Sequence, residues 1–245
     1  MKTPPYIPLA LVAMAVAFGG WTAEAAVIAQ YDFENSANRA LPSTTGANST
    51  VSQFGVNGGT LGTTVGFSGT GNVYMRSTAL TTTESGAVTA GDYLTFTVTP
   101  NTGYEFDLTS LTLLFGGSTS TGPFTVNGYL RSSLDNFATD LSLTGETYTP
   151  SGSEITYTTA TADLSSLANI VHATGITFRL YVTSSIGSND VYNDTANGAI
   201  FRADNVTLNG SIVAVPEPAN LHLAWVGVGA GLLVLRFRRR CRSAA

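Results

Sequence analysis

Short alternating runs of apolar and polar residues, separated by clusters of glycine, asparagine, serine and threonine, most constrain the fold of this chain. In the run from Leu94 to Val98, every second residue is apolar, and successive side chains of a strand point to opposite faces. No long stretch of the body shows the helical period of about 3.6 residues. The sequence therefore predicts an all-β protein, an antiparallel β-sandwich for which a jelly roll is the best specific topology.

The same pattern predicts individual elements. One helical turn is expected at 163–167, where Asp163 is suited to cap the N-terminus. The glycine-, threonine- and serine-rich stretch 41–71 is compatible with long loops or with irregular edge strands. The expected strands are 27–33, 49–55, 73–76, 92–99, 110–115, 124–131, 155–158, 175–183 and 199–208.

The first 25 residues are typical of a secretory signal peptide. Lys2 precedes an apolar stretch at 7–18, and Ala23 and Ala25 follow with the spacing of a signal-peptidase site. We expect cleavage after Ala25, so that a β-sandwich domain at 26–212 is exported. A signal anchor that stays attached is the alternative.

The C-terminus carries a second apolar segment, at 221–235. As a helix with a rise of about 1.5 Å per residue it would be roughly 22 Å long, a short single transmembrane helix. Basic residues after such a helix stay on the cytoplasmic side. The tail at 236–245 therefore predicts a membrane stop formed by Arg236, Arg238, Arg239, Arg240 and Arg242.

A proline-bracketed glutamate precedes this helix, in the linker at 213–220. Prolines fix φ and lack an N–H, so this segment is expected to be extended and unable to join a sheet. The order of a Val-Pro-Glu-Pro motif, a short apolar helix and a terminal arginine cluster is similar to the PEP-CTERM sorting signal of Gram-negative bacteria. The motif consists of Val215, Pro216, Glu217 and Pro218.

This resemblance covers residues 215–242 only. It implies that the chain is a substrate of exosortase, a membrane-embedded cysteine protease-transpeptidase that recognises residues 215–218. It implies export across the inner membrane, transient anchoring, and a final location at the cell surface or outside the cell, either attached or released. The family is also tied to exopolysaccharide and biofilm matrix.

The body of the protein is acidic. Between residues 26 and 215 there are five arginines, no lysine and 14 aspartates or glutamates, which gives a formal net charge of −9. Such a surface repels phosphate backbones, so nucleic acid is excluded as an expected partner. Cys241 is the single cysteine, so the body has neither a disulfide nor a cysteine nucleophile.

Segments at the two ends of the body, YDFEN at 31–35 and FRADNVTLNG at 201–210, resemble the first and last strands of galactose-binding-like, carbohydrate-module jelly rolls. FRLYV at 178–182 fits a penultimate strand. The resemblance implies a structural calcium ion shared by the first and last strands, held by Asp32, Glu34 and Asp204 with backbone carbonyls completing the shell. The alternatives are solvated charges at strand ends, or pairing of Asp204 with Arg202.

Several side chains on polar faces or in loops are suited to sugar binding. Aromatic rings stack on pyranose faces, and polar groups bond to hydroxyls. The alternative is that these tyrosines are present only because tyrosine favours strands. The candidates are Tyr129, Arg131, Tyr181, Tyr192 and Asn193.

Candidates for catalysis are few. His172 is the only histidine of the body, which leaves one possible base for a nucleophile. Two carboxylates suffice for a glycosidase, but Glu105 and Asp107 are explained as the polar face of a strand. We therefore predict a non-enzymatic surface or matrix protein that binds exopolysaccharide and has no catalytic residue. A polysaccharide-active hydrolase or lyase on the same sandwich is the alternative.

Overall fold

The computed structural model describes residues 26–35, 37–58, 60–65, 71–76, 81–118, 125–149, 156–171, 174–185 and 200–215. The predicted signal peptide, the membrane helix at 221–235, the arginine tail and residues 216–218 of the sorting motif lie outside these ranges. Among the residues that the structure describes, no helix has the length and apolar character needed to span a membrane.

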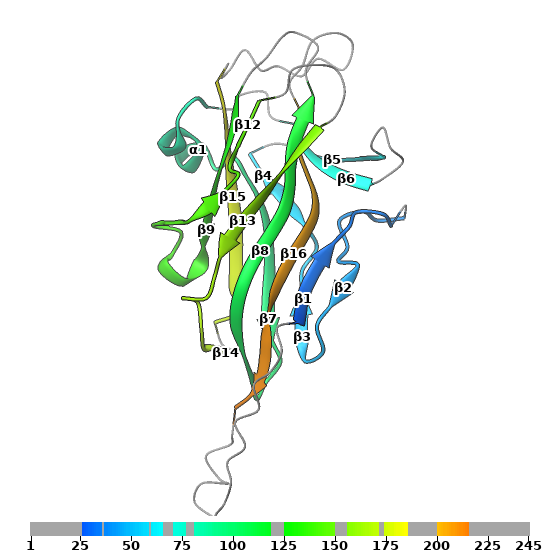
Figure 1. Cartoon of the computed structure of the whole chain (residues 1–245), viewed down its shortest axis with the longest axis vertical. Coiled ribbons are helices and arrows are strands. Elements are labelled where there is room, and N and C mark those ends of the chain that lie inside the picture. The colour runs from blue at the N-terminus through cyan, green and yellow to red at the C-terminus, as the bar shows by residue number, and fades with distance from the viewer. Residues whose placement is uncertain are drawn as a thin grey trace, which may run out of the picture.

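Two antiparallel sheets pack face to face, which confirms the predicted all-β sandwich (Figure 1). Within the described ranges, sheet A has the path β11-β13-β8-β16-β1-β2, with β14 beside β8 and the β5–β6 hairpin beside β16. Its strands are β1 (Ala26–Tyr31), β2 (Thr44–Thr45), β5 (Thr60–Val65), β6 (Gly71–Arg76), β8 (Tyr104–Ser118), β11 (Leu143–Thr144), β13 (Thr156–Asp163), β14 (Ile170–Val171) and β16 (Ile200–Ala214).

Sheet B has the path β10-β9-β15-β7-β3, with β12 beside β9 and β4 beside β7. One short helix, α1, joins the β6 region to β7 and contacts β15. The elements are β3 (Ser49–Val51), β4 (Gly55–Asn57), α1 (Glu84–Ala90), β7 (Tyr93–Pro100), β9 (Val126–Ser132), the 3₁₀ turn η1 (Ser133–Asp135), β10 (Asp140–Leu141), β12 (Thr147–Tyr148) and β15 (Ile176–Ser184).

The core lies between the sheets and follows the alternation in the sequence. On β7, Leu94, Phe96 and Val98 are buried, whereas the residues between them are half-exposed. Phe115 of β8 lies fully buried against Phe201 of β16, with ring centroids 4.8 Å apart. The polar positions of each strand are left on the outer faces, where a ligand can reach them.

The helical segments differ from expectation. The segment at 163–167 forms a turn but no helix: β13 ends at Asp163, whose carboxylate accepts the N–H of Ser165, and Leu167 donates its N–H to the Leu164 carbonyl. Helix α1 was not expected, since fewer than two full turns give no readable period. Its ends are nevertheless well defined: the Thr83 side chain accepts the N–H of Gly86, and Gly91 closes the helix at φ +76°.

Candidate functional site

Three tyrosines form a row across the outer face of sheet B. Tyr181 of β15 pairs directly with Tyr93 of β7 on one side and with Tyr129 of β9 on the other. Side chains of directly paired residues lie on the same face of a sheet. The rings of Tyr93 and Tyr181 contact edge to face, with centroids 5.2 Å apart.

A row of arginines runs beside the tyrosines. Two residues along each strand, Arg179 of β15 pairs with Arg131 of β9. The ring of Phe137, from the loop after η1, covers the Arg179 guanidinium. We call this face the sheet B site; it consists of Tyr93, Tyr129, Arg131, Phe137, Arg179 and Tyr181. Like charges that are directly opposite destabilise a sheet unless something compensates them.

Arg131 is compensated by two carboxylates. Its Nε donates to Asp140 Oδ1 at 2.7 Å, and Nη2 forms an ion pair with Glu84 at the start of α1. Burial acts to lower the pKa of Arg131, but hydrogen bonds and charge from Asp140 and Glu84 outweigh it and raise that pKa. Nη1 also donates to the Phe137 carbonyl at 3.0 Å, so Arg131 holds α1 and the Phe137 loop in place.

Arg179 lies between two aromatic rings. Its Cζ is 4.4 Å from the ring centroid of Tyr93 and 3.6 Å from that of Phe137. Nη1 lies 3.4 Å from the Tyr181 hydroxyl, and Nε is buried without a hydrogen-bond partner. Within the described part of the chain, no carboxylate forms an ion pair with this guanidinium. Arg131 is therefore held between two carboxylates, whereas its neighbour Arg179 is held between two aromatic rings.

Helix α1 packs against β15, the strand that carries the central tyrosine of the row. Tyr181 is only 2% exposed, so it supports its neighbours and does not present a free ring face. Tyr129 and Tyr93 are half-exposed. A depression of about 440 Å³ lies between α1 and β9 and is lined by Glu84, Ser85, Val88, Thr89 and Arg131.

The structure thus brings three of the sugar-binding candidates, Tyr129, Arg131 and Tyr181, onto one face of sheet B. Tyr192 and Asn193 lie outside the described residues. Three members of the site were missed at the sequence level. Two could have been found. Arg179 lies two residues before Tyr181 and so shares its face, and Tyr93 alternates with the inward-facing Leu94 and so faces outward. Phe137 belongs to a loop, for which no periodic pattern exists.

Strands β1 and β16 pair as first and last strands; Asp32 and Glu34 follow the end of β1, and Asp204 lies on β16. Asp204 is 2% exposed and accepts the Asn205 N–H at 2.7 Å. Burial, followed by the charges of Glu34 and Asp32, raises the pKa of Asp204 to about 6.

The electrostatic influence of Asp32 and Glu34 on Asp204 does not by itself make these residues a metal site. Among the described residues, no three His, Cys, Asp or Glu side chains lie close enough together to hold a metal ion. The charges of Glu34 and Asp32 act on Asp204 over distances longer than a metal site allows. They therefore raise the pKa of Asp204 without forming a metal site with it. The calcium ion stays a prediction.

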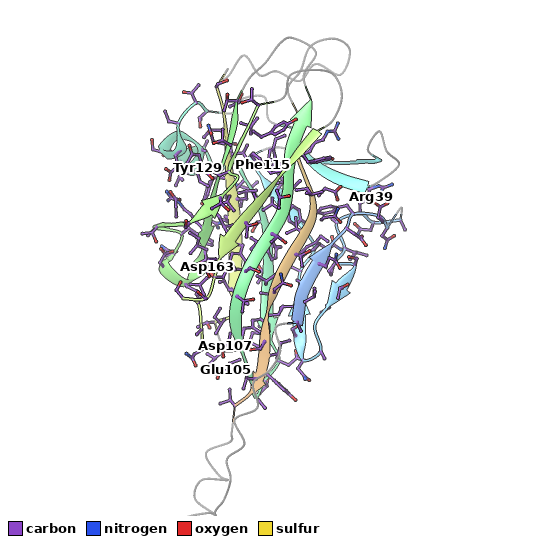
Figure 2. All side chains as sticks on the ribbon, in the orientation of Figure 1. Arg39, Glu105, Asp107, Phe115, Tyr129 and Asp163 are labelled. Carbon is purple, nitrogen blue, oxygen red and sulfur yellow. The ribbon has the colours of Figure 1, made fainter. Side chains whose placement is uncertain are left out.

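The two carboxylates considered for catalysis lie on sheet A. Figure 2 shows Glu105 and Asp107 together near the narrow end of the molecule, well away from Tyr129. Asp107 accepts the backbone N–H of Asn169 at 3.0 Å, which is a structural role. His172 lies outside the described residues.

No protein-family model and no curated protein sequence matches the chain. Several solved structures, among them the following three, are similar at a low level. A xylan-binding CBM22-1 domain of Paenibacillus barcinonensis Xyn10C has a TM-score of 0.41 and 8% identity, over 77% of this chain and 96% of that one. The mannan-recognising module TmCBM27 has a TM-score of 0.38 and 11% identity, over 77% and 99%.

The third is the K1 cleaved adhesin domain of Lys-gingipain from Porphyromonas gingivalis W83, with a TM-score of 0.31 and 13% identity, over 76% of this chain and 97% of that one. Values this low do not assign a family. The sheet B site is therefore defined by the geometry of this chain alone.

Proposed function

We propose that this protein is a non-enzymatic binding protein whose sandwich holds extracellular polysaccharide on the outer face of sheet B. The observation that carries the proposal is the row of three tyrosines beside two arginines, placed on three neighbouring strands by direct pairing. Aromatic rings supply the flat apolar surface on which sugars stack, and guanidinium groups supply donors for hydroxyls. The strands themselves are rigid, so little ordering is required when a ligand binds.

Within the sheet B site, one residue is suited to contact the sugar and the others hold the site in shape. Tyr129 is half-exposed and is the ring best placed to stack on a sugar. Arg131 fixes α1 through Glu84 and the Phe137 loop through a carbonyl, so it shapes the site. Tyr181 is buried, and its ring supports the ring of Tyr93.

The test is binding of the wild type and two variants to a glycan array, followed by affinity electrophoresis with each polysaccharide that binds. We expect Tyr129→Ala to weaken binding about tenfold or more, because truncating a tyrosine hot spot costs about 2 kcal/mol or more, and about 1.4 kcal/mol corresponds to a tenfold change. Tyr104→Ala is the matched control, since Tyr104 is a half-exposed tyrosine on sheet A. An array without a binding glycan, or equal weakening by both variants, would overturn the proposal. Release of reducing sugar from a bound polysaccharide would favour the hydrolase or lyase alternative.

We also propose that the protein reaches the cell exterior of a Gram-negative bacterium through the PEP-CTERM signal, with exosortase as its processing partner and the biofilm matrix as its destination. The support is the sequence at 215–242 together with the point at which the sandwich ends. Strand β16 ends at Ala214, and Val215 is 39% exposed. The tetrapeptide therefore begins where the strand pairing stops, at the narrow end of the molecule (Figure 1).

Intact-mass measurement on protein from the native host tests this proposal. We expect a chain that begins near Ala26 and lacks the arginine tail. Recovery of intact C-termini ending in Ala245 would overturn it. In the same proposal the sandwich is a jelly roll, a finer topology that an experimental structure would test.

A further inference from the structure

We propose that the ligand of the sheet B site is an acidic polysaccharide, and that Arg179 binds a uronate carboxylate of that polymer. This inference rests on the proposed polysaccharide function and narrows its ligand class. The observation behind it is the contrast between two neighbouring arginines, one with two carboxylate partners and one with none in the described part of the chain.

Partial burial of the Arg179 guanidinium, without a carboxylate partner among the described residues, is energetically unfavourable. Its guanidinium is stacked between two rings, and its Nε is shielded from solvent without a hydrogen-bond partner. A charge removed from water is unfavourable unless an opposite charge or good acceptors replace the water. Stacking on the rings of Tyr93 and Phe137 supplies only part of this compensation. A carboxylate in the guanidinium plane would supply the rest, because charge-assisted hydrogen bonds are roughly twice as strong as neutral ones.

The carboxylates around the site leave this position open. Glu84 and Asp140 both lie against Arg131, on the side of β10 and α1. Arg179 lies one strand further in, between β9 and β7. An anionic ligand at Arg179 is therefore offset from the protein's own acids, while the rest of the polymer can lie over Tyr129. The acidic body does not forbid this, since charges beyond about 8 Å are largely screened at physiological salt.

Backbone strain points to the same residue. Asn136 and Phe137 are consecutive left-handed residues, with φ of 58° and 61°. A bulky residue such as phenylalanine rarely adopts this conformation, and such strain gathers at binding sites. The conformation places the Phe137 ring over Arg179, and Asp135 holds the loop by accepting the N–H groups of Ala138 and Thr139. The fold thus maintains a strained loop that restricts the guanidinium to one plane.

The experiment measures binding of the full-length protein to two polyuronates, polygalacturonate and alginate, and to the same polymers after methyl esterification of their carboxyl groups. Esterification removes the charge and keeps the sugar backbone. We expect the wild type to bind at least one acid form about 10- to 100-fold more tightly than its ester, as expected for loss of a charge-assisted contact. Dextran sulfate is a third probe, and weaker binding to it would support a carboxylate ligand.

Variants locate the effect. Arg179→Gln should remove the preference for the acid form, whereas Arg179→Lys, which keeps a charge but not the planar fork, should retain part of it. Arg39→Gln is the matched control, because it removes the same charge on the opposite side of the molecule (Figure 2). Thermal melting checks that each variant folds, and the esterification comparison needs only the wild type.

The outcomes separate the two proposals. Equal binding to acid and ester forms, an unchanged preference in Arg179→Gln, or stronger binding to dextran sulfate would overturn the uronate inference. If neutral polysaccharides still bind and Tyr129→Ala still weakens them, the proposed function stands. Absence of binding to every glycan would overturn both.

Discussion

The Asp204 carboxylate should make the protein less stable as pH rises from 4 to 6. Burial, and then the charges of Glu34 and Asp32, raise its folded-state pKa from 3.8 to about 6. Between these values the unfolded chain has released its proton and the folded protein has not, so rising pH favours unfolding. At about 1.4 kcal/mol per pKa unit, the cost above pH 6 reaches at most about 3 kcal/mol.

Asp204→Asn removes the ionisation and keeps the oxygen that accepts the Asn205 N–H. In EDTA we expect this variant to be more stable than the wild type at pH 7, by up to about 3 kcal/mol, and equally stable below pH 4. The assay is urea unfolding across pH 3.5 to 7.5. Asp163→Asn is the control with the opposite sign. Hydrogen bonds to Ser165 lower the Asp163 pKa, so that variant should lose stability at neutral pH.

Bound calcium would reverse the expected effect of Asp204 ionisation on stability. A bound cation would favour ionised Asp204, so calcium should stabilise the wild type at pH 7 and leave Asp204→Asn unchanged. Parallel pH profiles of the wild type and Asp204→Asn in EDTA would refute the electrostatic reasoning. A wild type that gains no stability from calcium would refute the metal site.

Three further predictions concern the scaffold. Phe115→Ala, at a fully buried position against Phe201, should cost about 3–5 kcal/mol of unfolding free energy in urea, and a loss below about 1 kcal/mol would contradict the core assignment. Gly145→Ala, at φ +74°, places a methyl group against the Thr159 carbonyl and should lower the melting temperature more than Gly103→Ala, which has a similar φ of +83° but meets no neighbour. Glu84→Gln should speed hydrogen exchange at the Ala87 amide, because it loosens the contact of α1 with β9, and unchanged exchange would contradict that role.

Period-two alternation explains why so much of the fold could be predicted. Leu94, Phe96 and Val98 had to face inward together, since no other arrangement buries them from one strand. The same pattern fails where length or pairing decides. Strand β8 extends to both sides of the expected 110–115 because β13, β14 and β16 all pair with it, and no local pattern reports such partners.

The site shows the same division. Tyr129, Arg131 and Tyr181 were recognisable as polar-face residues, but sequence could not say that Tyr181 is buried. Nor could it distinguish the two arginines. Glu84 lies 47 residues from Arg131 and reaches it only through the fold.

The amino-acid sequence by itself determined an all-β body, the face on which each strand residue lies, and terminal segments with the pattern of export and sorting signals. Each of these depends on local periodicity or on residues that are adjacent in the chain. Tertiary structure alone decided that three tyrosines meet in a row and that Arg131 has two carboxylate partners, while Arg179 is stacked without one among the described residues. These features depend on strand register and on which side chains exclude water, and both are set by contacts between distant parts of the chain.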